Sequence, residues 1–242
     1  MSATEAREAE VVERSVESRL VLAFTVGAQI VAERLPDGWR GQPLGPGPSA
    51  GANLLLVLAD RHLVEPVGEN AGFATHSNLL AVVALPARGS RKGDEGLIIA
   101  SGISRAAGAP GPYGVFACGD GTMSRSLRAS CNGVGLIEER WTFSALQGDS
   151  LVVEVSYALS TPIRTPISTH AYSSADPSFM RTYRGEQGSL LLRSPILEAE
   201  RIKSHRIEAS GPDLSGIFTG AHSLVSVTAV PWLIRHAELS SK

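Results

Sequence analysis

Short apolar runs separated by turn residues fill most of the sequence from Leu20 onward. About ten such runs follow one another, and Gly, Pro, Asp or Ser stands between most of them. Runs of this length bounded by turn residues are typical of β-strands. A chain of 242 residues is also long enough to bury one core without disulfides. We therefore predict an α+β, β-rich fold, either a β-barrel or stacked antiparallel sheets, with few helices.

One pair of runs predicts a specific hairpin. The stretch "IEERWTFSALQGDSLVVEVSYAL" places two strand-like segments on either side of the turn "LQGDS". Because side chains alternate along a strand, Glu138 and Glu139 would face opposite sides. At most one of them can then point into a barrel. The stretch "LPDGWRGQPLGPGPSAG" is interpreted as a long ordered loop or lid.

The N-terminal segment has a different texture. Residues 2–18, "SATEAREAEVVERSVES", are rich in alanine and glutamate, and Ser2 or Thr4 could cap a helix. A frayed terminus is the alternative interpretation. We expect an N-terminal helix or arm over residues 1–19 and a single β-rich domain over residues 20–242.

Charge and composition exclude several classes of partner. The formal net charge is −2, which gives no electrostatic reason to bind nucleic acid or an anionic membrane. The N-terminus lacks the basic segment followed by an apolar run that is typical of a signal peptide. The apolar stretch around residues 20–32 is too short to span a bilayer. Two cysteines without a CxxC pair indicate reduced thiols. These features predict a cytoplasmic protein.

Common cofactor and catalytic motifs are missing from the sequence. The segment "GPGPSAG" lacks the GK[ST] of a phosphate loop, and neither HExxH, GxSxG nor a strand-associated GxGxxG occurs. We therefore expect no bound cofactor and no metal.

The segment "TMSRSLRASCNGVG", residues 122–135, resembles the signature of the acetoacetate decarboxylase family. In that signature an arginine opens a segment that runs through a proline into two adjacent lysines and a glycine. On this overlay Arg125 matches the arginine, Cys131 stands at the proline and Gly135 matches the closing glycine. Asn132 and Gly133 stand where the two lysines would be.

Two further segments are similar to the same family. "FATHSNLLAVVALP" resembles a strand that carries an active-site glutamate, with His76 in the place of that glutamate. "TGAHSLVSVTAVPWLIRHAEL" resembles the closing strands, including a histidine at His222. The resemblance extends from about Arg19 to Leu239. It implies an acetoacetate decarboxylase-like fold.

The departure from the signature bears directly on chemistry. Family decarboxylases form a Schiff base between a lysine and the substrate ketone, and the neighbouring ammonium lowers the pKa of that lysine. Asn132 cannot form a Schiff base, and Gly133 supplies no charge. Lys92 and Lys203 lie in strongly charged stretches that read as surface, and Lys242 is the only other lysine. We therefore predict that the chain is not an acetoacetate decarboxylase and that a pocket persists with its chemistry replaced.

The residues left at the matched positions can still bind and transfer protons. Asn132 could hold a carbonyl or enolate oxygen, and Arg125 and Arg128 could grip a carboxylate. His76 is a candidate acid or base. The arginines could equally form structural ion pairs, and His76 could be an ordinary residue at the rim or in the core.

A second polar cluster lies in "HAYSSADPSFMRTYRGEQGS". Such density suggests a functional loop or a contact between subunits, although a well hydrogen-bonded turn explains it as well. Arg184 and Glu186 rank above the other members because "YRGEQG" leads directly into a strand. The other polar members are His170, Tyr172, Asp176, Arg181, Tyr183 and Gln187.

These observations favour a cofactor-free small-molecule enzyme of the lyase, hydratase or isomerase type, acting on a carbonyl compound or an organic acid. The alternatives are a non-catalytic binding protein on the same fold and a metal enzyme with ligands from His76, His170 and His222. An assembly partner that uses the N-terminal helix is a third class, and we expect a homo-oligomer. The catalytic candidates are His76, Asn132 and Glu186, and the substrate-binding candidates are Arg125, Arg128, Arg184 and His222.

Overall fold

The computed structural model describes residues 10–68, 76–105, 113–130, 133–218 and 221–239. Within these ranges the chain is mostly strand, with two short α-helices and one 3-10 turn. The strands are β1 (Glu10–Val26), β2 (Trp39–Gly41), β3 (Leu54–Pro66), β4 (His76–Gly89), β5 (Glu95–Ser104), β6 (Phe116–Ser130), β7 (Gly133–Ala145), β8 (Ser150–Ala158), β9 (Ile163–Ser173), β10 (Met180–Ser194), β11 (Ala199–Glu200), β12 (Ile202–Ser210) and β13 (His222–Leu239). The helices are α1 (Ala28–Ala32) and α2 (Ser215–Phe218), and the 3-10 turn is Pro195–Leu197.

Seven strands pair into a closed ring. The order around the ring is β1, β3, β4, β5, β9, β10 and β13, and β13 pairs again with β1. All neighbours are antiparallel except β5 and β9, which run parallel and join at Leu97 and Ala171. A sheet that closes on itself has an inner face shielded from solvent, so inward side chains can form a cavity.

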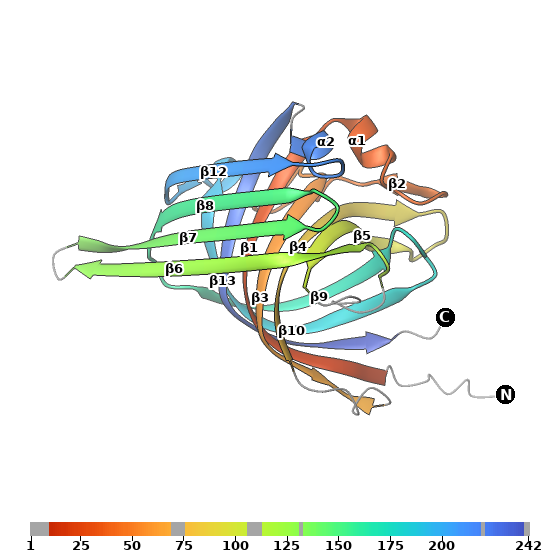
Figure 1. Cartoon of the computed structure of the whole chain (residues 1–242), viewed down its shortest axis with the longest axis horizontal. Helices are drawn as coiled ribbons and strands as arrows, with labels where there is room; N and C mark the ends of the chain where they lie inside the picture. Colours follow the sequence, from red (N-terminus) through yellow and green to blue (C-terminus); the bar gives the residue numbers. More distant parts are fainter. Residues whose placement is uncertain (1–9, 69–75, 106–112, 131–132, 219–220, 240–242) are drawn as a thin grey trace.

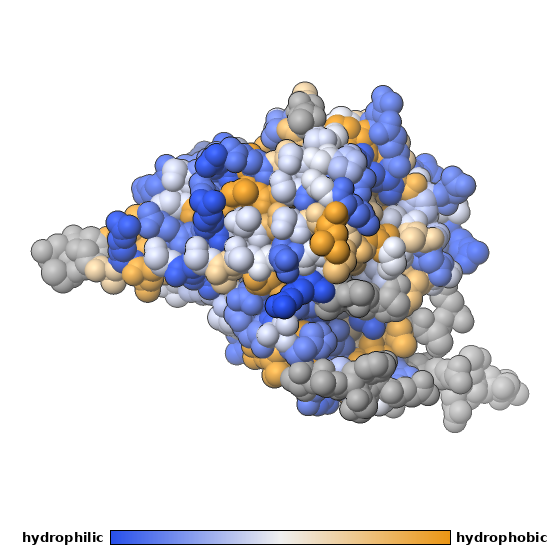
Figure 2. All heavy atoms as spheres, viewed as in Figure 1, coloured by the Kyte–Doolittle hydropathy of each residue, from blue (hydrophilic) through white to orange (hydrophobic). Residues whose placement is uncertain are grey.

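Four further strands form a front layer that lies across the outside of the ring (Figure 1). The layer consists of β6, β7, β8 and β12, and it joins the ring where β6 runs parallel to β5. Between the layer and the ring lies the larger apolar core. Trp141 and Phe143 of the layer and Leu22 and Phe24 of the ring are members of that core. The opposite face of the layer is largely polar (Figure 2).

Strand β3 shows how alternation divides the ring residues between two environments. Leu56 and Leu58 are fully buried in the core beneath the front layer. Val57 and Ala59 line a cavity inside the ring. Because successive side chains point to opposite faces, one strand serves both interiors.

The structure corrects the expected N-terminal helix from Glu10 onward, because these residues form strand β1. β1 runs through residue 19 without a break and pairs with both β13 and β3. Glu13, Ser15 and Glu17 occupy every second position of β1, and this period of two suits a strand with polar residues on one face. Inside the ring their carboxylates meet arginines of other strands, which a solvent-exposed helix could not provide. The rest of residues 1–19 lies outside the described residues.

The predicted hairpin and the predicted β-rich fold agree with the structure. Strands β7 and β8 form the predicted hairpin, joined by residues 146–149. The described α-helices have five and four residues, so neither has the length of a membrane-crossing helix. The β-rich fold with few helices is therefore confirmed.

Candidate functional site

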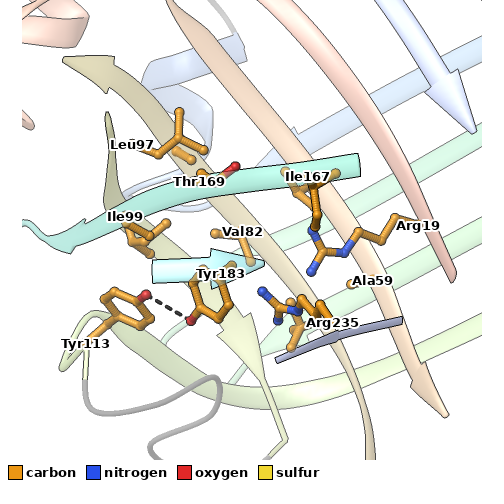
Figure 3. Close-up of a pocket in the computed structure, with 14 residues that line it drawn as sticks. Arg19, Ala59, Val82, Leu97, Ile99, Tyr113, Ile167, Thr169, Tyr183 and Arg235 are labelled. Atoms are coloured by element: carbon orange, nitrogen blue, oxygen red, sulfur yellow. Dashed lines mark hydrogen bonds between the residues drawn. The ribbon is translucent and has the colours of Figure 1, made fainter. Parts of the chain in front are cut away.

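The interior of the ring contains a cavity of about 130 Å³ (Figure 3). Its lining comes from all seven ring strands and from Tyr113. Most lining residues are Val, Ala, Leu or Ile, and the polar ones are Arg19, Tyr113, Thr169, Tyr183 and Arg235. An apolar cavity with a few convergent polar groups is the usual form of a small-molecule site.

Glu17 organises the charged side of this cavity. Its side chain is fully buried and accepts hydrogen bonds from Arg19 Nη2 at 2.6 Å, Arg235 Nε at 2.9 Å and Arg61 Nε at 3.1 Å. Ser15 Oγ donates to the same carboxylate at 2.7 Å. Burial alone would raise the pKa of Glu17, but the three arginines outweigh it and hold the pKa well below its usual range. Glu17 is therefore a permanent anion that fixes the arginines in place.

Positive charge is in excess inside the ring. Arg61 Nη2 donates to Glu13, and Arg181 Nη1 lies 3.8 Å from the same carboxyl group. Within the described part of the chain, Nε and Nη1 of Arg181 make no hydrogen bond. Among the described residues, this linked charge cluster has four arginines and two glutamates, namely Arg19, Arg61, Arg181, Arg235, Glu13 and Glu17. Because uncompensated buried charge is unfavourable, this interior favours an anionic guest.

Two tyrosines lie beside Arg235. The guanidinium carbon of Arg235 stacks 4.0 Å from the centre of the Tyr183 ring. Tyr183 Oη lies 2.9 Å from Tyr113 Oη. Burial and the adjacent Tyr183 raise the pKa of Tyr113 well above its usual value, so Tyr113 keeps its proton. If Tyr113 donates that proton to Tyr183 Oη, the hydroxyl proton of Tyr183 is free to point into the cavity.

The two catalytic candidates that the structure describes, His76 and Glu186, lie apart from the ring cavity. His76 is an exposed residue at the start of β4 and is not among the residues that line the ring cavity. Glu186 is half exposed on β10, where it forms an ion pair with Arg164. Asn132 lies outside the described residues. Their catalytic roles stay predictions.

The substrate-binding candidates are likewise apart from the ring cavity. Arg128 pairs with Glu138 at 3.1 Å and Arg184 with Glu238 at 3.1 Å, and both arginines are more than half exposed. His222 is exposed, and its ring centre lies 5.9 Å from that of Phe24. For these residues too, a role in binding stays a prediction.

Arg125 belongs to the front layer, where it serves a buried carboxylate. Its Nε donates to Glu139 Oε1 at 3.0 Å. Trp141 Nε1 and Tyr157 Oη complete the hydrogen bonds to Glu139, at 3.0 and 2.6 Å. Glu138, the next residue, points outward with a side chain that is 44% exposed, so the two glutamates face opposite sides as expected. Arg125 also lines a concavity of about 500 Å³ on the front layer, together with Glu138 and Glu139.

Neither lysine that the structure describes is near the cavity. Lys92 lies in the turn between β4 and β5, and Lys203 lies in β12; both are exposed. Their interpretation as surface residues is confirmed. Among the described residues, no group of three His, Cys, Asp or Glu side chains is placed to hold a metal ion, and this includes His76, His170 and His222.

Sequence reasoning missed the arginine and glutamate cluster, although a signal for it was present. Glu13, Ser15, Glu17 and Arg19 occupy every second position of "ERSVESR", which is the period of a strand with one polar face. In the segment after His170, alternation likewise separates the inward Tyr183 from the outward Arg184.

Comparisons with known proteins give matches in structure alone. No protein-family model and no curated protein matches the sequence. The structure is similar to the enduracididine biosynthesis enzyme MppR complexed with pyruvate, with a TM-score of 0.53 and 13% identity over 99% of this chain and 92% of that chain. It is also similar to an acetoacetate decarboxylase-like enzyme from Sphingomonas wittichii RW1, with a TM-score of 0.53 and 12% identity over 98% of both chains.

MppR complexed with the condensation product of pyruvate and imidazole 4-carboxaldehyde is similar as well, with a TM-score of 0.51 and 12% identity over 99% of this chain and 91% of that chain. At such low identities the likeness concerns the fold, and it extends over nearly the whole chain. Together with the resemblance of the sequence segments, it shows that this chain has the acetoacetate decarboxylase-like fold.

Proposed function

We propose that the chain is a cofactor-free enzyme of the lyase, hydratase or isomerase type that binds a small carbonyl acid inside the ring. The observation that carries the proposal is the pair Arg19 and Arg235 at one apolar cavity (Figure 3). Glu17 occupies Nε of Arg235 and both Nε and Nη2 of Arg19. Within the described chain, Nη1 of Arg19 and the two Nη groups of Arg235 make no hydrogen bond, so they can donate to a guest.

This arrangement suits a carboxylate and a developing enolate. Guanidinium groups bind planar anions through parallel hydrogen bonds, and these bonds are stronger in an apolar surrounding. Donors that are already fixed in place stabilise negative charge as it forms, without reorganisation. Tyr183, whose proton can point into the cavity, would protonate or polarise the carbonyl oxygen.

The similar structures give limited support in the same direction. MppR has been solved with pyruvate, a small carbonyl acid, and a second similar structure is an acetoacetate decarboxylase-like enzyme. No lysine is among the described residues that line the cavity. Polarisation by hydrogen bonds would therefore take the place of a Schiff base. A homo-oligomeric state and a cytoplasmic location stay predictions from the sequence.

A non-catalytic binding protein is the second candidate, and one observation favours it. The titratable groups that line the cavity are Arg and Tyr, and Glu17 is held ionised by its three arginines. No carboxylate or imidazole is among the described residues that line the cavity, so the cavity itself offers no ordinary general base. Proton exchange on a bound carbonyl acid separates the two candidates.

Replacing Arg235 by lysine tests the binding site. Lysine keeps the charge beside Glu17 but cannot bond Glu17 and a carboxylate through one fork. Losing a charge-assisted hydrogen bond costs about 1.5–3 kcal/mol, so pyruvate should bind about tenfold to 150-fold more weakly. Titration calorimetry of both proteins with pyruvate measures the difference.

The matched control is Arg128→Lys, because Arg128 is 74% exposed and apart from the cavity. It should leave the affinity for pyruvate unchanged. Equal affinities in wild type and Arg235→Lys, or equal losses in the two variants, would place the carboxylate somewhere else.

A further inference from the structure

A second, outer pocket adjoins the ring cavity. It has a volume of about 410 Å³, and its lining includes Gln42, Leu44, Leu55, Pro86 and Glu95. Two residues, Leu97 and Thr169, line both this pocket and the ring cavity. Leu97 and Thr169 therefore form the boundary between the two spaces.

Exposure along β5 shows that the outer pocket lies on the way to solvent. Glu95, Leu97 and Ile99 are two residues apart, so their side chains lie on the same face of the strand. Ile99 is 8% exposed, Leu97 is half-buried, and the side chain of Glu95 is 53% exposed. The inner face of the ring thus opens progressively from Ile99 to Glu95.

The charged groups lie at the other side of the cavity. In Figure 3, Leu97 and Arg235 stand at opposite corners of the lining, with Val82 between them. An anionic head bound to Arg235 would therefore direct the rest of the molecule toward Leu97 and Thr169. A cavity of about 130 Å³ holds about ten water-sized groups at most. A substrate with more non-hydrogen atoms than that must extend beyond the ring cavity.

We propose that the outer pocket binds the apolar tail of the substrate and that Leu97 and Thr169 set how wide that tail can be. This inference rests on the proposed function of the ring cavity. The substrate class is then an elongated 2-oxo acid, with its carboxylate at Arg19 and Arg235 and its tail against Leu44, Leu55 and Pro86. Those three residues give the outer pocket an apolar wall. Among its polar residues, Gln42 Nε2 donates to Glu95 Oε1 at 3.0 Å, and Ser168, Thr169 and His170 also line the pocket.

Binding of straight-chain 2-oxo acids of increasing length, from pyruvate to 2-oxooctanoate, tests the proposal by calorimetry. Each methylene buried in the outer pocket should tighten binding about fourfold. Leu55→Trp fills the outer pocket without touching the ring cavity, because Leu55 lines only the former. This variant should bind 2-oxooctanoate at least about tenfold more weakly and pyruvate within about twofold of wild type.

A second variant is expected to increase the affinity for a 2-oxo acid with a wide tail. Leu97→Ala removes one side of the boundary, so 4-phenyl-2-oxobutanoate should gain affinity relative to pyruvate. The control is Leu127→Trp on the front layer, where Leu127 is 57% exposed. It should leave the affinities for 2-oxooctanoate and for 4-phenyl-2-oxobutanoate unchanged relative to that for pyruvate.

The possible failures are distinguishable. If wild type binds pyruvate but longer acids bind no more tightly, and neither variant changes the ratios, the tail does not occupy the outer pocket. If wild type binds no 2-oxo acid at all, the proposed function fails and the tail site fails with it.

Discussion

Replacing Glu17 by glutamine is expected to lower the free energy of unfolding by about 3–5 kcal/mol at neutral pH. Glu17 is fully buried and accepts hydrogen bonds from Arg19, Arg61 and Arg235. Glutamine has a similar shape but no charge, so three guanidinium groups would lose their shared counter-ion. Leaving buried charge unpaired costs much more than losing an exposed pair. Denaturant unfolding of both proteins measures the difference.

Glu138→Gln is the matched control for this stability effect. Glu138 also pairs with an arginine, but its side chain is 44% exposed and that of Arg128 is 74% exposed. Pairs of this kind contribute about 1 kcal/mol or less. Equal effects of the two substitutions would contradict the organising role of Glu17.

The pH dependence of this stability effect follows from the lowered pKa of Glu17. The pKa of Glu17 is lower in the folded than in the unfolded chain, where a glutamate titrates near pH ~4.3. Its contribution to stability is therefore fully present above that pH and is lost as the pH falls through the folded pKa. The stability difference between wild type and Glu17→Gln should shrink as the solution is acidified below about pH 4.

Replacing Tyr183 by phenylalanine is expected to slow proton exchange at the methyl group of pyruvate by about 10²–10⁴-fold, the usual contribution of a general acid or base. Tyr183 borders the cavity, and its Oη bonds to that of Tyr113 at 2.9 Å. Phenylalanine keeps the ring under Arg235 but removes the hydroxyl group. Pyruvate should therefore still bind with nearly unchanged affinity. Exchange is followed by NMR in D2O.

Tyr157→Phe is the comparison for this prediction. Tyr157 is also a buried tyrosine with a hydrogen bond, at 2.6 Å to Glu139, but it lies in the core beneath the front layer. Its replacement should leave the exchange rate unchanged. Absence of exchange in wild type, despite binding, would favour the non-catalytic binding protein.

Much of the fold was predictable because it depends on local pattern. Period-two alternation and turn residues identify strands such as β8, "SLVVEVSYA", without any knowledge of their partners. The closure of the ring was harder to predict from the sequence. It depends on the parallel contact of β5 with β9, between residues far apart in sequence, and no local pattern encodes such a pairing.

The first strand shows where local reasoning fails. Alanine, glutamate and arginine favour helix by propensity, and β1 begins in such a segment. The tertiary structure overrides helix propensity here, because the inward Glu13 and Glu17 form ion pairs with Arg61 and Arg235. These arginines come from β3 and β13, which lie next to β1 in the sheet but far from it in sequence. A sequence alone shows a polar residue but not the partner that permits its burial.

The candidate site was hard to predict for the same reason. Motif comparison directed attention to Arg125 and His76, since both match positions of one family signature. The cavity instead takes its polar groups from β1, β9, β10 and β13 and from Tyr113, one residue from each. Each of them is an unremarkable residue in its own segment, and only the closed ring brings them together.

A crystal structure of the chain with pyruvate would show where the carboxylate binds. We expect non-covalent pyruvate in the ring cavity, with its carboxylate in contact with Arg19 and Arg235 and its carbonyl oxygen near Tyr183 Oη. Pyruvate joined to a lysine, or bound beside Arg125 on the front layer with the ring cavity empty, would contradict it.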